Sequence, residues 1–63
     1  MNSERLFFDE IHLARRWGIS RRTLQQQRYR GTGCQYVKLG GSVRYPLDAV
    51  LRYERKHTVE GTE

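Results

Sequence analysis

The sequence predicts a small α+β domain in which two short helices, joined by a tight glycine turn, precede a two-stranded β-hairpin and a third helix. Three observations favour this class. Helix start and stop signals occur twice in succession, a Gly-Gly pair separates two short alternating apolar runs, and an apolar stripe with helical spacing follows Pro46. The chain has 63 residues, so we expect one domain at 1–57 and a flexible tail at 58–63.

The first helix is predicted between Asp9 and Gly18. Asp9 is a favoured residue at a helix N-cap, and Glu10 in the first turn suits the positive end of the helix dipole. Leu13 and Trp17 lie four residues apart and therefore share one face, which we expect to be core. Glycine accepts the left-handed backbone that commonly ends a helix, so Gly18 is the predicted stop.

The second helix repeats this pattern between Ser20 and Gly31. Ser20 is the predicted N-cap, and Ile19 before it is placed to pack on Leu24 as a hydrophobic staple. Because only Gly18 and Ile19 separate the two helices, the chain must bend sharply there. Two helices joined in this way are a helix-turn-helix motif.

The hairpin around Gly40 and Gly41 allows two registers. A two-residue turn pairs Lys38 with Val43 and mixes polar and apolar residues on both faces. A three-residue loop that includes Ser42 places Lys38 opposite Arg44 and gathers the apolar side chains on one face, so we predict this register. The apolar face then consists of Val37, Leu39, Val43 and Tyr45. Like charges directly opposite each other are destabilising, so the Lys38–Arg44 pair suggests a phosphate beside it.

The third helix is predicted to start at Pro46, where the missing N–H is harmless. Its expected core stripe is Leu47, Val50 and Leu51, extended at the edge by Tyr53.

The charge pattern indicates a polyanionic partner. The net charge is +5, and no Asp or Glu occurs between Ile11 and Leu47. Eight basic residues fall within that interval: Arg15, Arg16, Arg21, Arg22, Arg28, Arg30, Lys38 and Arg44. A solvated surface normally mixes both signs, so a block of one sign favours a polyanion, of which double-stranded DNA is one, as the partner.

Other classes find little support in the sequence. Cys34 is the single cysteine and the two histidines lie far from it, so we expect neither a disulfide nor a metal site. No nucleophile, histidine and carboxylate occur in a recognisable order, which argues against an enzyme and against a cofactor. No run is apolar enough for a membrane helix or a signal peptide, so we expect no membrane partner and a cytoplasmic location.

The outer surface of the second helix carries the side-chain types that recognise base edges in a major groove, because arginine pairs with guanine and glutamine with adenine. The predicted base-reading residues are Arg21, Arg22, Gln25, Gln26 and Tyr29. The predicted phosphate-binding residues are Ser20, Thr23, Arg28, Arg30, Lys38 and Arg44. The hairpin would then act as a wing that rests on the DNA backbone and positions the helix.

Residues 14–54 resemble the MerR-like winged helix-turn-helix domains of phage excisionases and AlpA-type regulators. The matching motifs are Gly18-Ile19-Ser20, Arg22-Thr23-Leu24, Gly31-Thr32-Gly33, Val37-Lys38-Leu39-Gly40, Val43-Arg44-Tyr45 and Tyr53. The chain departs from the family pattern at Gln27, where the family commonly has an apolar residue, and at Cys34, where proline is frequent.

The resemblance implies a DNA-binding protein of a bacterium, phage or integrative element that regulates transcription or acts as a recombination directionality factor beside a site-specific recombinase. One small domain covers few base pairs, so we expect further copies on tandem sites, touching through exposed apolar residues such as Ile11. Two alternatives stay open. The basic face can dock on an acidic protein, or Tyr36 and Tyr45 can stack on RNA bases.

Overall fold

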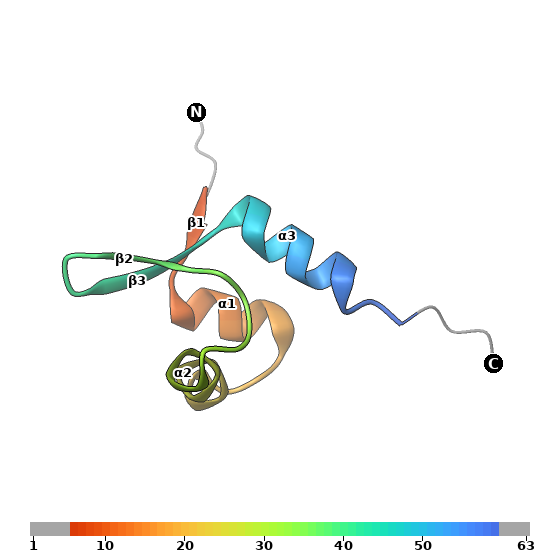
Figure 1. The fold of residues 1–63 in the computed structure, drawn as a ribbon, viewed down its shortest axis with the longest axis horizontal. Coiled ribbons are helices and arrows are strands. Elements are labelled where there is room, and N and C mark those ends of the chain that lie inside the picture. The colour runs from red at the N-terminus through yellow and green to blue at the C-terminus, as the bar shows by residue number, and fades with distance from the viewer. Residues whose placement is uncertain (1–5, 60–63) are drawn as a thin grey trace.

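The computed structural model describes residues 6–59, which form three helices and a three-stranded antiparallel sheet (Figure 1). In chain order the elements are β1 (Phe7–Phe8), α1 (Glu10–Trp17), α2 (Arg21–Arg30), β2 (Val37–Leu39), β3 (Ser42–Pro46) and α3 (Leu47–Lys56). The predicted α+β class, with a helix-turn-helix, a hairpin and a third helix, is confirmed. Of the predicted tail at 58–63, residues 60–63 lie outside the described residues.

The helix-turn-helix is bounded by the predicted caps. The Asp9 side chain accepts a hydrogen bond from the His12 backbone N–H at 2.8 Å, and Gly18 ends α1 with φ of 66°. Ser20 Oγ accepts from the Thr23 N–H at 3.1 Å, and Gly31 ends α2 with φ of 75°. Serine and aspartate supply acceptors for the free N–H groups of a first turn, whereas glycine tolerates positive φ, so local chemistry fixes these four boundaries.

The predicted hairpin register is wrong. Lys38 pairs with Val43, and Val37 pairs with Arg44, across a two-residue turn. Gly40, the first turn residue, has φ of 64°, which is typical of the type II′ turns that match the twist of a hairpin. The outer end of the hairpin extends beyond the core, as the 58% exposure of Leu39 shows. Burial therefore does not force the apolar residues onto one face. Turn geometry sets the register instead.

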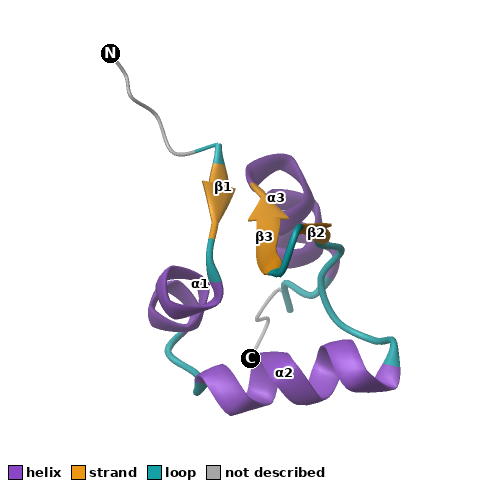
Figure 2. Cartoon of the chain, turned by 90° about the vertical axis from the view of Figure 1, so that its left-hand side faces the viewer, coloured by secondary structure: helices purple, strands orange, loops and turns teal. Residues whose placement is uncertain are grey.

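The sheet has a third strand that the sequence analysis did not predict. Phe8 pairs with Tyr45 and Phe7 with Pro46, so β1 lies along β3 and the strand order is β1-β3-β2. Figure 2 shows β1 and β3 side by side. A two-residue strand carries no alternation that a sequence pattern can reveal, and its partner lies far away along the chain.

The buried face of α3 includes Val50 as predicted, but Leu51 does not belong to it. Ala49 and Val50 are buried, whereas Leu51 is 42% exposed. The half-buried Tyr53 ring stacks on Trp17 with their ring centroids 5.3 Å apart. This contact turns the Ala49 side of α3, rather than the Leu51 side, toward the rest of the fold.

The core lies between the helices and the sheet. Its buried members are Leu13, Ala14, Leu24, Cys34, Tyr45, Ala49 and Val50, and Phe8, Trp17, Ile19, Val43 and Tyr53 pack around them. The hairpin projects to one side of the helix-turn-helix and α3 extends to the other (Figure 1). This arrangement leaves the outer surface of α2 uncovered.

Candidate nucleic-acid interface

The polar residues of α2 form two stripes along the helix. Residues 22, 26 and 29 form one, which we call the open stripe, and residues 21, 25 and 28 form the other, which we call the bound stripe. Each set is spaced i, i+4, i+7, so its side chains follow one another along one side of the helix. The two stripes divide the predicted interface because their surroundings differ.

The open stripe faces solvent. Arg22, Gln26 and Tyr29 line a shallow hollow together with Gln25, and Tyr29 is 92% exposed. Among the hydrogen bonds and ion pairs of residues 6–59, none involves the side chains of Arg22, Gln26 or Tyr29. Their donors and acceptors are therefore free for an external ligand.

The bound stripe is held by one acidic residue of α1, Glu10. Its Oε2 atom accepts from Arg21 Nε at 3.1 Å, from Arg21 Nη2 at 3.0 Å and from Gln25 Nε2 at 2.9 Å. Its Oε1 atom accepts from Arg28 Nη2 at 3.1 Å. Burial raises the pKa of Glu10, but the hydrogen bonds from Gln25, Arg21 and Arg28 outweigh it and hold the pKa below its usual value of 4.5. Glu10 is therefore ionised at neutral pH.

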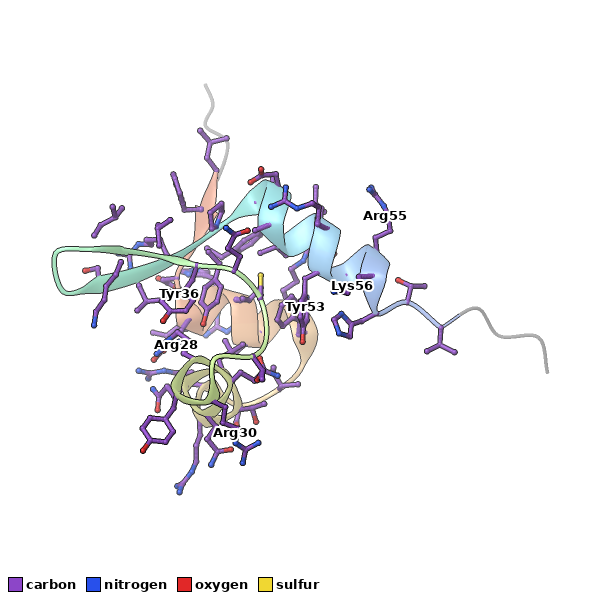
Figure 3. All side chains as sticks on the ribbon, in the orientation of Figure 1. Arg28, Arg30, Tyr36, Tyr53, Arg55 and Lys56 are labelled. Atoms are coloured by element: carbon purple, nitrogen blue, oxygen red, sulfur yellow. The ribbon has the colours of Figure 1, made fainter. Side chains whose placement is uncertain are left out.

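Arg28 belongs to the interior more than to the outer surface. Its Nη1 donates to the Tyr45 hydroxyl at 2.7 Å, and its guanidinium lies 5.8 Å from the centre of the Tyr36 ring. Figure 3 shows Arg28 on the side of α2 that faces Tyr36. With a side chain only 17% exposed, Arg28 links α2 to the sheet, and little of it is accessible to a phosphate.

The two basic residues of the hairpin do not face each other as predicted. Because Lys38 pairs with Val43 and Val37 with Arg44, Lys38 and Arg44 lie on opposite faces. Lys38 is exposed, whereas the half-buried Arg44 donates from Nη1 to the Val43 carbonyl at 2.8 Å. The predicted like-charge repulsion is therefore absent.

A cleft of about 320 Å³ separates the hairpin from α2. Its lining residues are Asp9, Glu10, Ile11, Arg21, Gln25, Arg28, Gly41, Val43 and Arg44. Both carboxylates of the α1 N-terminus lie here, among three arginines. The pKa of Asp9 is also held below its usual value, first by the His12 backbone hydrogen bond. The cleft therefore already contains two carboxylates that offset most of the charge of its three arginines.

The remaining predicted phosphate contacts lie at the two ends of α2. Ser20 Oγ and Thr23 Oγ1 are 3.0 Å apart and hydrogen-bonded to each other at the helix N-terminus. Arg30 lies exposed at the other end, on the side of the molecule away from α3 (Figure 3). Free N–H groups and the helix dipole favour an anion near Ser20, whereas Arg30 offers only its charge.

A second basic surface lies on α3, and the sequence analysis did not select it. Arg52, Arg55 and Lys56 line an open hollow with Gln35 and Tyr53. Arg55 points away from the molecule on the side opposite α2 (Figure 3). The i, i+3, i+4 spacing of these cations is a signal that the sequence contained, but they fall outside the acid-free interval that directed attention to α2.

Of the two tyrosines that the RNA alternative names, Tyr36 is 39% exposed, whereas Tyr45 is buried. Tyr45 is 1% exposed and its hydroxyl accepts from Arg28, so its ring is not available to an unpaired base. Trp17 packs on the core and donates from Nε1 to Glu54 at 2.6 Å.

Burial raises the pKa of the Cys34 thiol to about 11, so Cys34 is a poor nucleophile at neutral pH.

The comparisons with known proteins add no family. No protein-family model matches this sequence, and no curated protein is similar enough to count as a match. Within residues 6–59, none of the helices has the length and apolar character needed to cross a bilayer. The function must therefore be argued from the surface itself.

Proposed function

We propose that this chain binds duplex DNA in a sequence-specific manner, with α2 in the major groove. The observation that carries the proposal is the open stripe. Arg22, Gln26 and Tyr29 lie exposed on the second helix of a helix-turn-helix, and no described side chain satisfies them. Arginine and glutamine are the side chains that pair with guanine and adenine edges, each good pair contributing about 1–3 kcal/mol of discrimination.

The charge distribution supports a polyanion over a protein partner. The interval from Ile11 to Leu47 contains no acidic residue. Lys38 lies on β2, whereas the carboxylates of Asp9 and Glu10 lie at the start of α1. In this proposal Lys38, Arg30 and the N-terminus of α2 bind phosphates, and the open stripe reads bases. The division gives each group a separate measurable consequence.

The resemblance to excisionases and AlpA-type regulators extends the proposal. The biological role would be transcriptional regulation or recombination directionality in a phage or integrative element, in the cytoplasm. Since one α2 helix spans few base pairs, several copies would occupy tandem sites, and a site-specific recombinase would be a partner in the second role. Protected sites over a promoter favour the first role, and tandem sites beside a recombination junction favour the second.

Selection from duplexes with a randomised centre tests the proposal. Immobilised protein is washed at about 0.15 M salt with excess random competitor, which removes complexes held by long-range charge alone. Enrichment of a common motif is the expected result. If no duplex is retained, or if the retained pool stays random, sequence-specific binding is excluded. Retention of an acidic protein in place of DNA would favour the protein-interaction alternative.

Three variants sharpen this experiment. Arg22→Ala should relax the preference at one or two base pairs, at a cost of about 1–3 kcal/mol for the selected duplex. Lys38→Ala should weaken selected and random duplexes alike. Arg55→Ala removes an equal charge from α3 on the side opposite α2 and serves as the matched control. Equal effects of Arg22→Ala and Lys38→Ala on both duplexes would contradict the division between base and phosphate contacts.

A further inference from the structure

Glu10 occupies an unusual position for an acidic residue in a basic protein. Among the acidic residues of 6–59, Glu10 alone forms ion pairs with α2, and it does so with Arg21 and Arg28. Glu10 lies in the first turn of α1, where the helix dipole alone would account for an exposed acid. Its side chain is instead 17% exposed and directed at the neighbouring helix.

The two carboxylate oxygens have different partners. Oε1 binds Arg28, whose side chain is also 17% exposed, so this contact lies inside the fold. Oε2 binds Arg21 and Gln25, and the Arg21 side chain is 56% exposed. The inner contact therefore fixes the carboxylate, and the outer contacts fix the direction of two side chains that reach the α2 surface.

This geometry has three consequences for a ligand on α2. Arg21 donates both Nε and Nη2 to Glu10, so this edge of its guanidinium is not available to a phosphate unless the contact breaks. A side chain already held in one direction also loses less conformational freedom when it contacts a base edge. The carboxylate itself repels phosphates in the cleft between α2 and the hairpin.

We propose that Glu10 is a positioning residue that sets sequence discrimination. Its carboxylate holds Arg21 and Gln25 in the direction needed for base contacts, and it opposes phosphate contacts that form when those base contacts are absent. This inference rests on the proposed function, and it concerns a residue outside the predicted interface. Removing the charge should increase binding to random DNA more than binding to the selected sequence.

The test compares Glu10→Gln with Asp48→Asn by fluorescence anisotropy on the selected duplex and on a scrambled duplex. Both changes raise the net charge by one, but Asp48 is 76% exposed on α3, where its described partner is Arg52. Glu10→Gln should tighten random binding by about 3- to 10-fold and lower the selected-to-random affinity ratio by a similar factor, since the freed Arg21 gains about one phosphate contact. Asp48→Asn should leave the ratio unchanged.

Salt dependence separates this role from a purely structural one. The slope of log affinity against log salt on the random duplex should become steeper by about one for Glu10→Gln. Circular dichroism at the assay temperature establishes that the variant is folded. In an Arg21→Ala background the effect of Glu10→Gln on the ratio should shrink to the part that depends on Gln25 and on phosphate repulsion, because one of the two positioned side chains is gone.

The outcomes distinguish the inference from the function on which it rests. If the wild-type protein prefers no duplex, both fail. If it discriminates but Glu10→Gln matches Asp48→Asn in ratio and slope, the inference alone is overturned. Should Glu10→Gln fail to fold, Arg21→Lys replaces it. Lysine keeps the positive charge and leaves the Glu10–Arg28 contact intact, but it lacks the Nε donor of arginine. An unchanged selected-to-random ratio in Arg21→Lys would equally overturn the inference.

Discussion

At the scale of single residues, the structure separates polar groups that an internal partner holds in one direction from those that have no partner among residues 6–59. Arg21 and Arg22 are neighbours in the sequence, and both carry the same chemistry. Arg21 is bonded to Glu10, whereas Arg22 lines the open hollow on α2. Partner geometry, rather than residue type, therefore decides which arginine is free.

The side-chain amide of Gln27 has a buried oxygen that lacks a hydrogen-bond partner among residues 6–59. A Cβ on Gly33 would lie 2.7 Å from this Oε1 atom. A buried, unpaired amide oxygen costs about 1–3 kcal/mol, so an apolar side chain of similar length should be better tolerated there.

We therefore expect Gln27→Met to raise the free energy of unfolding by about 1 kcal/mol in urea denaturation. Gln26→Met is the matched control, because Gln26 is exposed on the same helix and its replacement should change stability by no more than about 0.5 kcal/mol. A loss of stability in Gln27→Met with a neutral Gln26→Met would show that the amide has a partner in solution.

At the scale of elements, the caps were predictable and the pairings were less so. Asp9, Gly18, Ser20 and Gly31 bound the first two helices because each signal acts within a few residues. The register of β2 on β3 depends on a competition between turn geometry and apolar alternation, and turn geometry prevails because this hairpin is only partly buried. The pairing of β1 with β3 left no sequence pattern at all.

The observed register makes a prediction for Lys38→Glu. Arg44 lies on the opposite face of the hairpin, so the new carboxylate cannot pair with it across the strands, and the free energy of unfolding should change by no more than about 0.5 kcal/mol. In the alternative register the new pair would add up to about 1 kcal/mol. A stabilisation that disappears in an Arg44→Ala background would contradict the register.

The packing of α1 against α3 depends on Glu54. Arg16 Nε and Nη2 donate to its two oxygens at 2.6 and 3.0 Å, and Trp17 Nε1 donates at 2.6 Å. The Arg16 and Trp17 hydrogen bonds lower the pKa of Glu54 from 4.5 to about 2. A carboxyl whose pKa is lower in the folded state stabilises the fold above its unfolded pKa.

Stability should therefore fall as the pH decreases from about 4.5 to about 2, and Glu54→Gln should flatten this part of the profile. The difference in melting temperature between wild type and Glu54→Gln should be largest above pH 4.5 and mostly lost by pH 2. Asp48→Asn, which breaks an exposed i, i+4 pair with Arg52, should show almost no such difference. A pH-independent difference for Glu54→Gln would indicate that shape, not charge, matters there.

At the scale of the whole molecule, local patterns predicted the fold class, whereas the polyanionic partner that the charge distribution favours stays a prediction. The acid-free interval directed attention to α2 and the hairpin, and the structure leaves the α2 surface uncovered. The contacts of Glu10 with Arg21, Gln25 and Arg28 were not predictable, because they depend on the angle at which α1 crosses α2. The α3 cations were missed for a different reason, since acids flank them in the sequence.

The most direct test of the central claim is the affinity of the wild-type protein for the selected duplex and for its scrambled counterpart, measured across a range of salt concentrations. Two or three base contacts of about 1–3 kcal/mol each predict that the selected duplex binds about 30-fold more tightly or better, and that both affinities fall steeply as salt rises. Equal affinity for the two duplexes at every salt concentration, or no binding to either, would contradict the claim that α2 reads DNA sequence.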